Sequence, residues 1–263
     1  MWFADVALDA AWLLVACWLG WLLAPALIRR WAPAGPAPDR RRMVAVGAGI
    51  AATLNLAQAA VLDSVEDDSG VGRLDQPLLT WLVAHRSADL TRFARAASAV
   101  GSPPTWVVVV VLVVGWLCLR RRRLEAAVLT GAGAGAFLLV AGGKAVLGRA
   151  RPPVADHLVV ETNQSLPSGH ALGSIVVLGL LVVLVLRRVG SAAVRAVVVL
   201  VAATAVCLIG LSRLYLGVHW TTDVLAGWLL GGAWLTACVT VLAVLPGAAR
   251  GGRTTRGLSF AEN

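Results

Sequence analysis

Residues 212–223 read SRLYLGVHWTTD and lie between two apolar runs, at 192–211 and 224–245. Each run is about as long as the ~20 residues that a helix needs to cross the hydrocarbon core of a membrane. An arginine, a histidine and an aspartate therefore stand where two predicted membrane helices meet. Ionisable groups are costly close to hydrocarbon, and those found there mark functional sites. The stretch thus predicts both a membrane fold and a polar site at its helix ends.

The composition supports the membrane fold along the whole chain. Of 263 residues, 59% are hydrophobic and 14% are charged, and the mean hydropathy is +0.80. A soluble domain carries about 25% charged residues. Because the apolar residues gather in blocks of spanning length, we predict an all-α, multi-pass transmembrane helical bundle. We place its spans at about 10–28, 43–62, 102–119, 124–147, 169–186, 192–211 and 221–245.

The seven spans divide the chain into three parts. We expect an N-terminal extra span and a cytoplasmic loop at 1–42, a six-helix membrane core at 43–245, and a basic cytoplasmic tail at 246–263. The opening MWFADVALDA contains no lysine or arginine, which argues against a signal peptide, so we expect the first span to be retained. An alternative has six spans, with residues 1–30 peripheral.

The placement of the basic residues predicts the orientation of the bundle. The formal net charge is +9, but the arginines come in short clusters between apolar blocks, which is the positive-inside pattern and not a nucleic-acid-binding face. Alternate crossings put all of these clusters on one side, which we take as the cytoplasm, and the acidic loop after 62 on the other. We therefore expect a cell-membrane protein with a cytoplasmic C-terminus. The clusters are Arg29–Arg30, Arg40–Arg42, Arg120–Arg123, Arg187–Arg188, and Arg250, Arg253 and Arg256.

Other residues carry weaker predictions. The segment from Leu74 to Val100 is amphipathic and too polar to span, so we expect it to lie along the outer interface with Trp81 and the leucines facing lipid. Glycines four residues apart mark positions where helices can approach closely. No disulfide or metal spacing connects the cysteines, which we expect to be packing or lipid-facing residues. The glycine pairs are Gly131 with Gly135 and Gly227 with Gly231, and the cysteines are Cys17, Cys118, Cys207 and Cys238.

Three polar clusters stand at the outer ends of the predicted spans. They are KAVLGRARP at 144–152, PSGH at 167–170 and the stretch at 212–223. Each has a simple structural explanation when taken alone: charges that extend to the membrane surface, a helix cap, and a hydrogen-bonded His–Asp pair on one helix face. Because successive spans cross the membrane in alternate directions, however, all three clusters come to the same membrane face. Their convergence predicts an anion site with acid–base chemistry.

The cations and the helix end suit a phosphate. Lys144, Arg151 and Arg213 supply positive charge, and the two guanidinium groups fit phosphate oxygens. Lys144 is the only lysine of the chain. Ser168 and Gly169 open a predicted helix, whose free N–H groups form an anion site. We therefore expect these five residues to bind phosphate.

The histidines then supply the chemistry of phosphoryl transfer. His219 can act as the nucleophile if Asp223 fixes its tautomer and stabilises its positive form. His170 is the candidate acid that protonates the leaving oxygen. The remaining histidines, His85 and His157, are expected at the solvated surface.

The three clusters match the signature K-x6-R-P, P-S-G-H and S-R-x5-H-x3-D without a gap. The chain therefore resembles the type 2 phosphatidic acid phosphatase superfamily, which also contains bacterial acid phosphatases and vanadium haloperoxidases. The resemblance implies a phosphohistidine at His219, oriented by Asp223, with His170 as the acid. It also implies phosphate binding by the five residues named above, and no metal or other cofactor. The first span is an addition to the six-helix core of membrane members.

The expected function is hydrolysis of a lipid phosphate or diphosphate, with the lipid substrate and the membrane bilayer as partners and no nucleic acid. Phosphatidate, phosphatidylglycerol phosphate and polyprenyl diphosphates all fit this expectation. An alternative on the same fold is a lipid phosphotransferase, which passes the phosphoryl group to an acceptor other than water. A transporter and a scaffold with a decayed site are the remaining alternatives. The first is disfavoured because the ionisable residues stand at span ends, and the second because the signature is intact.

Overall fold

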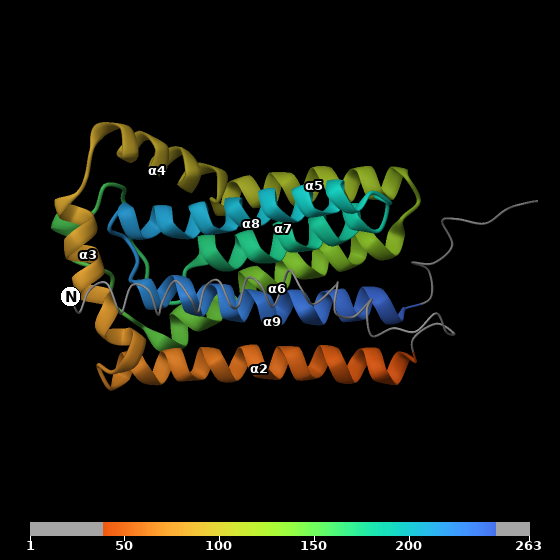
Figure 1. Cartoon of the computed structure of the whole chain (residues 1–263), viewed down its shortest axis with the longest axis horizontal. Coiled ribbons are helices and arrows are strands. Elements are labelled where there is room, and N and C mark those ends of the chain that lie inside the picture. Colours follow the sequence, from red (N-terminus) through yellow and green to blue (C-terminus); the bar gives the residue numbers. More distant parts are fainter. Residues whose placement is uncertain (1–38, 246–263) are drawn as a thin grey trace, which may run out of the picture.

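The computed structural model describes residues 39–245, and these form a bundle of long helices (Figure 1). No β-strand occurs among them, so the predicted all-α class is confirmed. The predicted span at 10–28, Cys17 and the basic tail at 246–263 lie outside the described residues. The elements are α2 (Arg40–Glu66), η1 (Gly70–Leu74), α3 (Asp75–Ala84), α4 (Ala88–Val100), α5 (Pro103–Leu119), α6 (Arg123–Leu147), η2 (Val154–Asp156), α7 (Gly169–Leu186), α8 (Ala192–Tyr215) and α9 (Thr221–Val244).

Five helices are long and apolar enough to cross a membrane: α2, α6, α7, α8 and α9. A sixth crossing comes from α4 and α5, which pass the same test as a pair bent by 43°. The helices coincide with the six predicted core spans, although α2 extends about a turn beyond the prediction at each end and α8 extends about a turn beyond it at its C-terminal end. In both helices the extra turns carry charged residues, which a hydropathy pattern assigns to loops.

Local sequence sets the helix ends. Serines cap the first turns of three helices by accepting a hydrogen bond from a backbone N–H three residues on: Ser87 for α4, Ser102 for α5 and Ser191 for α8. Pro103 follows Ser102 at the start of α5, where a missing N–H costs nothing.

All arginine clusters in the described residues lie at one end of the bundle. Figure 1 shows the start of α2, the α5–α6 turn and the α7–α8 turn together at the right, and these carry Arg40–Arg42, Arg120–Arg123 and Arg187–Arg188. The long 148–168 loop, the α8–α9 turn and α3 lie at the opposite end. The three motif clusters therefore share one end of the bundle, as the alternate crossings predicted.

The helix α7 forms the centre of the bundle. It contacts α5, α6, α8 and α9, and ten of its 18 residues are buried. Its sequence is apolar on every side, as is typical of a helix surrounded by other helices. Leu172, Val176 and Leu180 of α7 pack against Leu129 of α6 and Leu235 of α9. This packing fixes the N-terminus of α7, where PSGH lies, relative to the ends of its neighbours.

Glycines on α9 allow it to lie directly against α7. A Cβ on Gly227 would stand 2.8 Å from the backbone oxygen of Ser168, and one on Gly231 would stand 3.0 Å from that of Leu172. The predicted close approach at this pair is therefore confirmed. The other predicted pair behaves differently: Gly135 packs under Trp234, whereas Gly131 has open space where a Cβ would lie.

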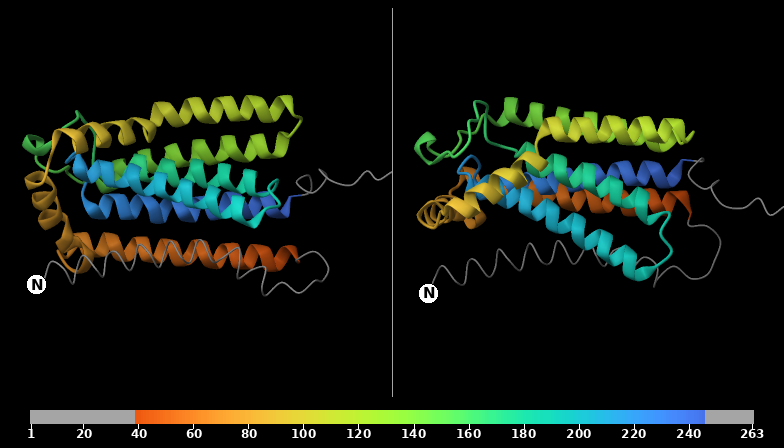
Figure 2. Two further views of the ribbon diagram at one scale, coloured as in Figure 1. Left: turned by 45° about the horizontal axis from the view of Figure 1, so that its top comes forward. Right: turned by 90° about the horizontal axis from the view of Figure 1, so that it is seen from above.

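The segment 74–100 differs from its prediction. Helix α3 does lie across the end of the bundle, but α4 runs beside α8 and continues into α5 (Figures 1 and 2). Trp81 is 49% exposed, as expected, whereas Leu79 is 4% exposed. Leu78 and Leu82 also pack inward, against a cluster formed by α7, α8 and α9. The expectation that the leucines face lipid was wrong for those of α3, because α3 covers the apolar ends of three core helices, whereas Leu90 of α4 is 52% exposed.

We predict that Gly227→Ala lowers the thermal stability of the protein in detergent, because the added Cβ meets backbone atoms of α7 that cannot move independently. Overpacking of this kind costs about 1–3 kcal/mol. The matched control is Gly131→Ala, since alanine favours a helix over glycine by about 1 kcal/mol at both positions. The measurement is the midpoint of thermal unfolding for both variants. Equal midpoints would show that the α7–α9 contact is looser than described.

Candidate active site

The buried pair of His219 and Asp223 opens α9. His219 lies in the turn before the helix, and Asp223 is the third residue from the cap Trp220, whose backbone N–H it accepts at 2.8 Å. The same oxygen, Oδ2, lies 3.3 Å from Nδ1 of His219. The four-residue spacing suggested that the two side chains share a helix face. They do not, because the helix begins only at Thr221. A capping carboxylate instead reaches back to the imidazole.

The turn that leads to His219 depends on Gly217. Its φ is +72°, and a Cβ there would lie 2.2 Å from the backbone oxygen of Asp156. This position has the backbone conformation that favours glycine. The turn places His219 under the long loop.

The carboxylate of Asp223 has partners on both oxygens. Oδ2 also accepts a short hydrogen bond from the hydroxyl of Ser165, and Oδ1 accepts one from Nη1 of Arg149 at 2.6 Å. Asp223 and Ser165 are both fully buried. A buried carboxylate with four donors around it is held in one orientation. Asp223 is therefore placed to orient the ring of His219.

The other imidazole nitrogen of His219 faces a cation. Its Nε2 lies 3.2 Å from Nη1 of Arg151, which also donates to the backbone oxygen of Val218. Burial lowers the pKa of His219 to about 4, although the hydrogen bond and the charge of Asp223 act in the opposite direction. The positive charges of Arg151 and Arg213 lower this pKa further. This low pKa favours the neutral form of the ring at physiological pH.

A second buried guanidinium completes the cationic wall. Arg213, in the last turn of α8, is 2% exposed. Its Nη1 donates to the hydroxyl of Ser98 on α4 at 2.5 Å, and its Nη2 makes a short contact with Glu161. Glu161 also lies 3.4 Å from Nη2 of Arg151. One loop carboxylate thus contacts both arginines that were predicted to bind phosphate.

The loop before PSGH connects Lys144 to this wall. Nζ of Lys144 donates to the side-chain oxygen of Asn163 at 3.2 Å and makes a short contact with the backbone oxygen of Gln164. Arg151 donates to the same Asn163 side chain at 2.6 Å. Lys144 and Arg151 therefore share a hydrogen-bond acceptor, although Lys144 lies in α6 and Arg151 in the loop that follows it.

The N-terminus of α7 contributes the last predicted group. Ser168 caps the helix without using its side chain, Gly169 is the first helical residue, and His170 is buried beside them. Within residues 39–245, four buried side-chain polar atoms lack a hydrogen-bond partner, and two of them are Oγ of Ser168 and Nε of Arg213. A buried donor without an acceptor costs about 1–3 kcal/mol. Both atoms belong to residues that were predicted to bind phosphate.

The structure thus brings the motif residues together at one end of the bundle, and it adds several that the sequence interpretation missed. The missed residues are Asp75, Ser98, Arg149, Glu161, Asn163, Ser165 and Thr222. Arg149 and Thr222 stand inside the quoted motifs, where a second guanidinium and a hydroxyl were visible signals. Of the remaining histidines, His85 is exposed as expected, but His157 is half-buried and bonded to the backbone oxygen of Pro152.

Nothing in the described part of the chain resembles a metal centre, since no group of three His, Cys, Asp or Glu side chains is suitably placed there. The cysteines within it are unpaired. Cys118 is exposed, Cys207 is half-buried and Cys238 is buried, as expected of packing and lipid-facing residues.

The family model of the PAP2 superfamily matches residues 124–245, which contain all three motifs. This match agrees with the resemblance that the three motifs indicated. Phosphatidylglycerophosphatase B of Bacillus subtilis (strain 168) is 37% identical over 84 residues, an alignment that spans 32% of this chain and 41% of that protein. The fold is similar to the crystal structure of a transmembrane PAP2-type phosphatidylglycerolphosphate phosphatase from Bacillus subtilis. That comparison has a TM-score of 0.66 and 23% identity, and it covers 72% of this chain and 94% of the other.

We predict that His219 stays neutral throughout the physiological range. Its depressed pKa means that the ring gains a proton only as the pH falls through about 4. The measurement is nitrogen NMR of labelled histidine in a variant in which the other three histidines, His85, His157 and His170, are glutamine. A transition near the ordinary value of about 6.5 would contradict the burial that the structure assigns to this ring.

Proposed function

We propose that the chain is an integral-membrane phosphatase that hydrolyses a lipid phosphate or diphosphate through a phosphohistidine on His219. The observation that carries the proposal is the orientation of this ring. Nδ1 is held by Asp223, and Nε2 faces the guanidinium of Arg151. A neutral nucleophile is thus aimed at the place where an anion would be bound.

In the first step, Nε2 of His219 attacks phosphorus and the bond to the leaving oxygen breaks. The negative charge of the bound substrate stabilises the protonated form of His170, and this imidazolium gives the leaving oxygen its proton. His170 is the other buried histidine at this end of the bundle. The new imidazolium keeps its Nδ1 proton, which points to Asp223. Asp223 therefore stabilises the positive ring that the reaction creates.

In the second step, a water attacks the phosphorus of the phosphohistidine. His170, now unprotonated, takes a proton from this water, and the P–N bond breaks to release inorganic phosphate. His219 returns to its neutral form. The two steps together consume one water and restore every group of the site.

The phosphoryl oxygens are bound by positive charge and by backbone donors. Arg151, Arg213 and Lys144 provide the charge, and Ser168 and Gly169 open α7, whose first N–H groups have no partners within the helix. These groups stand at fixed positions before the substrate arrives. Fixed dipoles of this kind stabilise a transition state without reorganisation. In this proposal no metal ion is required.

The position of the site favours a lipid substrate. The site lies at the end of a bundle of apolar helices of spanning length, and in a membrane such an end would stand near the phosphates of the lipids. The Bacillus subtilis relative and the similar Bacillus subtilis structure are both named for phosphatidylglycerol phosphate, so this lipid is the first candidate. We place the site on the extracytoplasmic face, because the arginine clusters lie at the other end.

We predict that the purified protein releases phosphate from lipid phosphates in mixed micelles with a kcat/KM at least about a hundredfold above that for a short-chain phosphomonoester. Burial of hydrocarbon contributes about 0.8 kcal/mol per CH₂, and a hundredfold requires only about 2.7 kcal/mol. The measurement uses phosphatidylglycerol phosphate, phosphatidate and a polyprenyl diphosphate, with His219→Ala as the inactive control. Equal efficiency on the soluble ester would exclude a lipid-specific enzyme, and a new phosphorylated lipid in place of free phosphate would identify a phosphotransferase.

We predict that EDTA leaves this activity unchanged, because side chains and the helix N-terminus supply the positive charge. Orthovanadate should inhibit, since it mimics the five-coordinate phosphorus bonded to His219. The measurement compares rates before and after dialysis against the chelator. A loss of activity that a divalent ion restores would show that a metal takes part.

We predict that the site faces outward in intact cells. In a chain whose own cysteines are alanine, Ala155→Cys places a thiol on η2, beside the site, and Ala192→Cys places one at the start of α8, at the arginine-rich end. Both alanines are exposed. An impermeant thiol reagent should label the first variant and leave the second unlabelled until the membrane is broken. The opposite pattern would reverse the orientation.

A further inference from the structure

Asp75 forms a buried contact with the active site from outside all three motifs. It is the first residue of α3, the helix that lies across the end of the bundle, and its side chain is 8% exposed. Its two oxygens accept hydrogen bonds from the backbone N–H of Thr222 at 3.0 Å and from its hydroxyl at 2.5 Å. Thr222 is the neighbour of Asp223, so α3 is bonded directly to the turn that carries the predicted orienting carboxylate.

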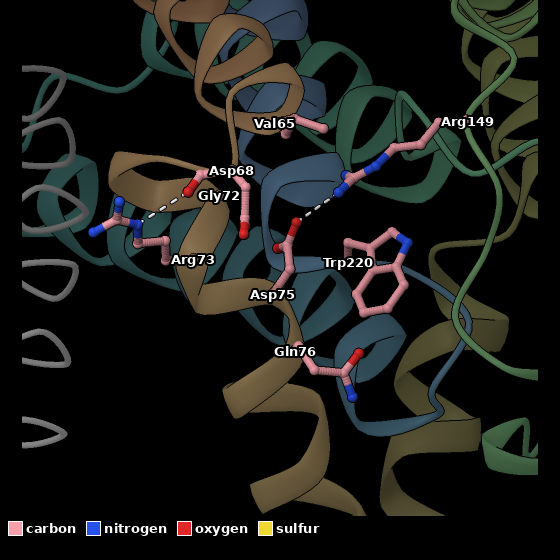
Figure 3. A pocket seen from close by; sticks show the side chains of 8 residues that line it. All are labelled: Val65, Asp68, Gly72, Arg73, Asp75, Gln76, Arg149 and Trp220. Atoms are coloured by element: carbon pink, nitrogen blue, oxygen red, sulfur yellow. Dashed lines mark hydrogen bonds and ion pairs between the residues drawn. The ribbon is translucent and has the colours of Figure 1, made fainter.

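Arg149 joins the two carboxylates. Nη2 lies 2.7 Å from Oδ2 of Asp75, and Nη1 lies 2.6 Å from Oδ1 of Asp223 (Figure 3 shows the first of these contacts). Nη1 also donates to the hydroxyl of Thr222 at 2.7 Å. The planar guanidinium packs at 5.7 Å from the ring of Trp220. A single arginine therefore connects α3, the first motif and the start of α9.

The charges of this group suggest why two carboxylates are present. Arg149 alone beside Asp223 would neutralise the carboxylate that has to stabilise a positive His219. With Asp75 as a second partner, the guanidinium is shared and the three groups together carry one negative charge. Burial raises the pKa of Asp75 above its ordinary value, and the hydrogen bonds from Thr222 and Arg149, which stabilise the charged form, oppose this rise. The shared arginine thus keeps negative charge behind the imidazole.

A helix cap does not explain Asp75. An acidic residue at a helix start is common, because it interacts favourably with the helix dipole. Here, however, α3 has no side-chain cap at its start, and both oxygens of Asp75 are directed at α9 and Arg149. The contacts belong to the site and not to α3 itself.

We propose that Asp75 and Arg149 are positioning residues of the reaction, which hold Asp223 against His219 and preserve its charge. The proposal rests on the phosphohistidine mechanism above. It also gives α3 a role, since this helix would tie the interfacial end of the bundle to the nucleophile. Neither residue is in reach of the phosphoryl group in this account; both act through Asp223.

The test uses Asp75→Asn, which keeps the shape of the side chain and removes its charge. We expect kcat for the lipid phosphate to fall at least about tenfold and KM to change less than threefold, because the anion-binding residues are untouched. The matched control is Glu125→Gln at the opposite end of the bundle. Glu125 is also a buried carboxylate paired with an arginine, Arg122, at 2.7 Å. Its variant should keep kcat within about twofold of the parent.

Two binding measurements separate positioning from a general loss of structure. Orthovanadate bonds to the nucleophile, whereas inorganic phosphate needs only the cations. Asp75→Asn should therefore weaken vanadate at least about tenfold and leave phosphate within about twofold. Equal weakening of both ligands, or equal kcat for Asp75→Asn and Glu125→Gln, would overturn the proposal.

A second variant covers the case in which Asp75→Asn does not fold. Thr222→Val has nearly the same volume and removes only the hydroxyl that bonds Asp75 and Arg149. Like Asp75→Asn, it should lower kcat and the affinity for vanadate and leave the affinity for phosphate unchanged. A kcat and a vanadate affinity equal to those of the parent would also overturn the proposal. If the parent chain hydrolyses no lipid phosphate, the proposed function fails, but the vanadate and phosphate measurements still decide whether Asp75 positions His219.

Discussion

The end of the bundle that carries the candidate site depends on one buried carboxylate. Asp223 is fully buried, and its charge is stable there only because every side of it is occupied by a donor. Those donors come from the cap of α9, from the two ends of the 148–168 loop and from the imidazole of His219. The need to satisfy this charge thus draws distant segments of the chain to one point.

The remaining charges of the site follow the same rule. Arg213 and Arg151 are buried or half-buried cations, and Glu161 contacts both of them. Arg149 lies between two acids. Isolated charges of this kind would be costly so close to hydrocarbon, so the site consists of alternating signs linked by hydrogen bonds. Such a network is suited to bind an anion, because the anion can replace a carboxylate as the partner of a cation and no cation is then left unpaired.

The features that could be predicted from the sequence are those that depend on residues close together in the chain. Hydropathy blocks predicted the six core crossings, and the three motifs predicted the residues that meet at one end. What the sequence could not predict are contacts between residues far apart in the chain. Ser98 meets Arg213 only because α4 packs beside α8, and Asp75 meets Thr222 only because α3 turns across the bundle. The inward leucines of α3 were missed for the same reason, since an amphipathic pattern does not say whether its apolar face meets lipid or protein.

The central claim is that His219 carries the phosphoryl group between substrate and water. The most direct measurement is rapid acid-free quenching of the protein during turnover of a lipid labelled with radioactive phosphorus, followed by mapping of the labelled peptide. We expect a label that is stable to alkali and labile to acid, on the tryptic peptide that begins at Leu214 and contains His219. Replacement of His219 by glutamine should remove it. Phosphate release at the full rate with no label, or an acid-stable label elsewhere in the chain, would contradict the account.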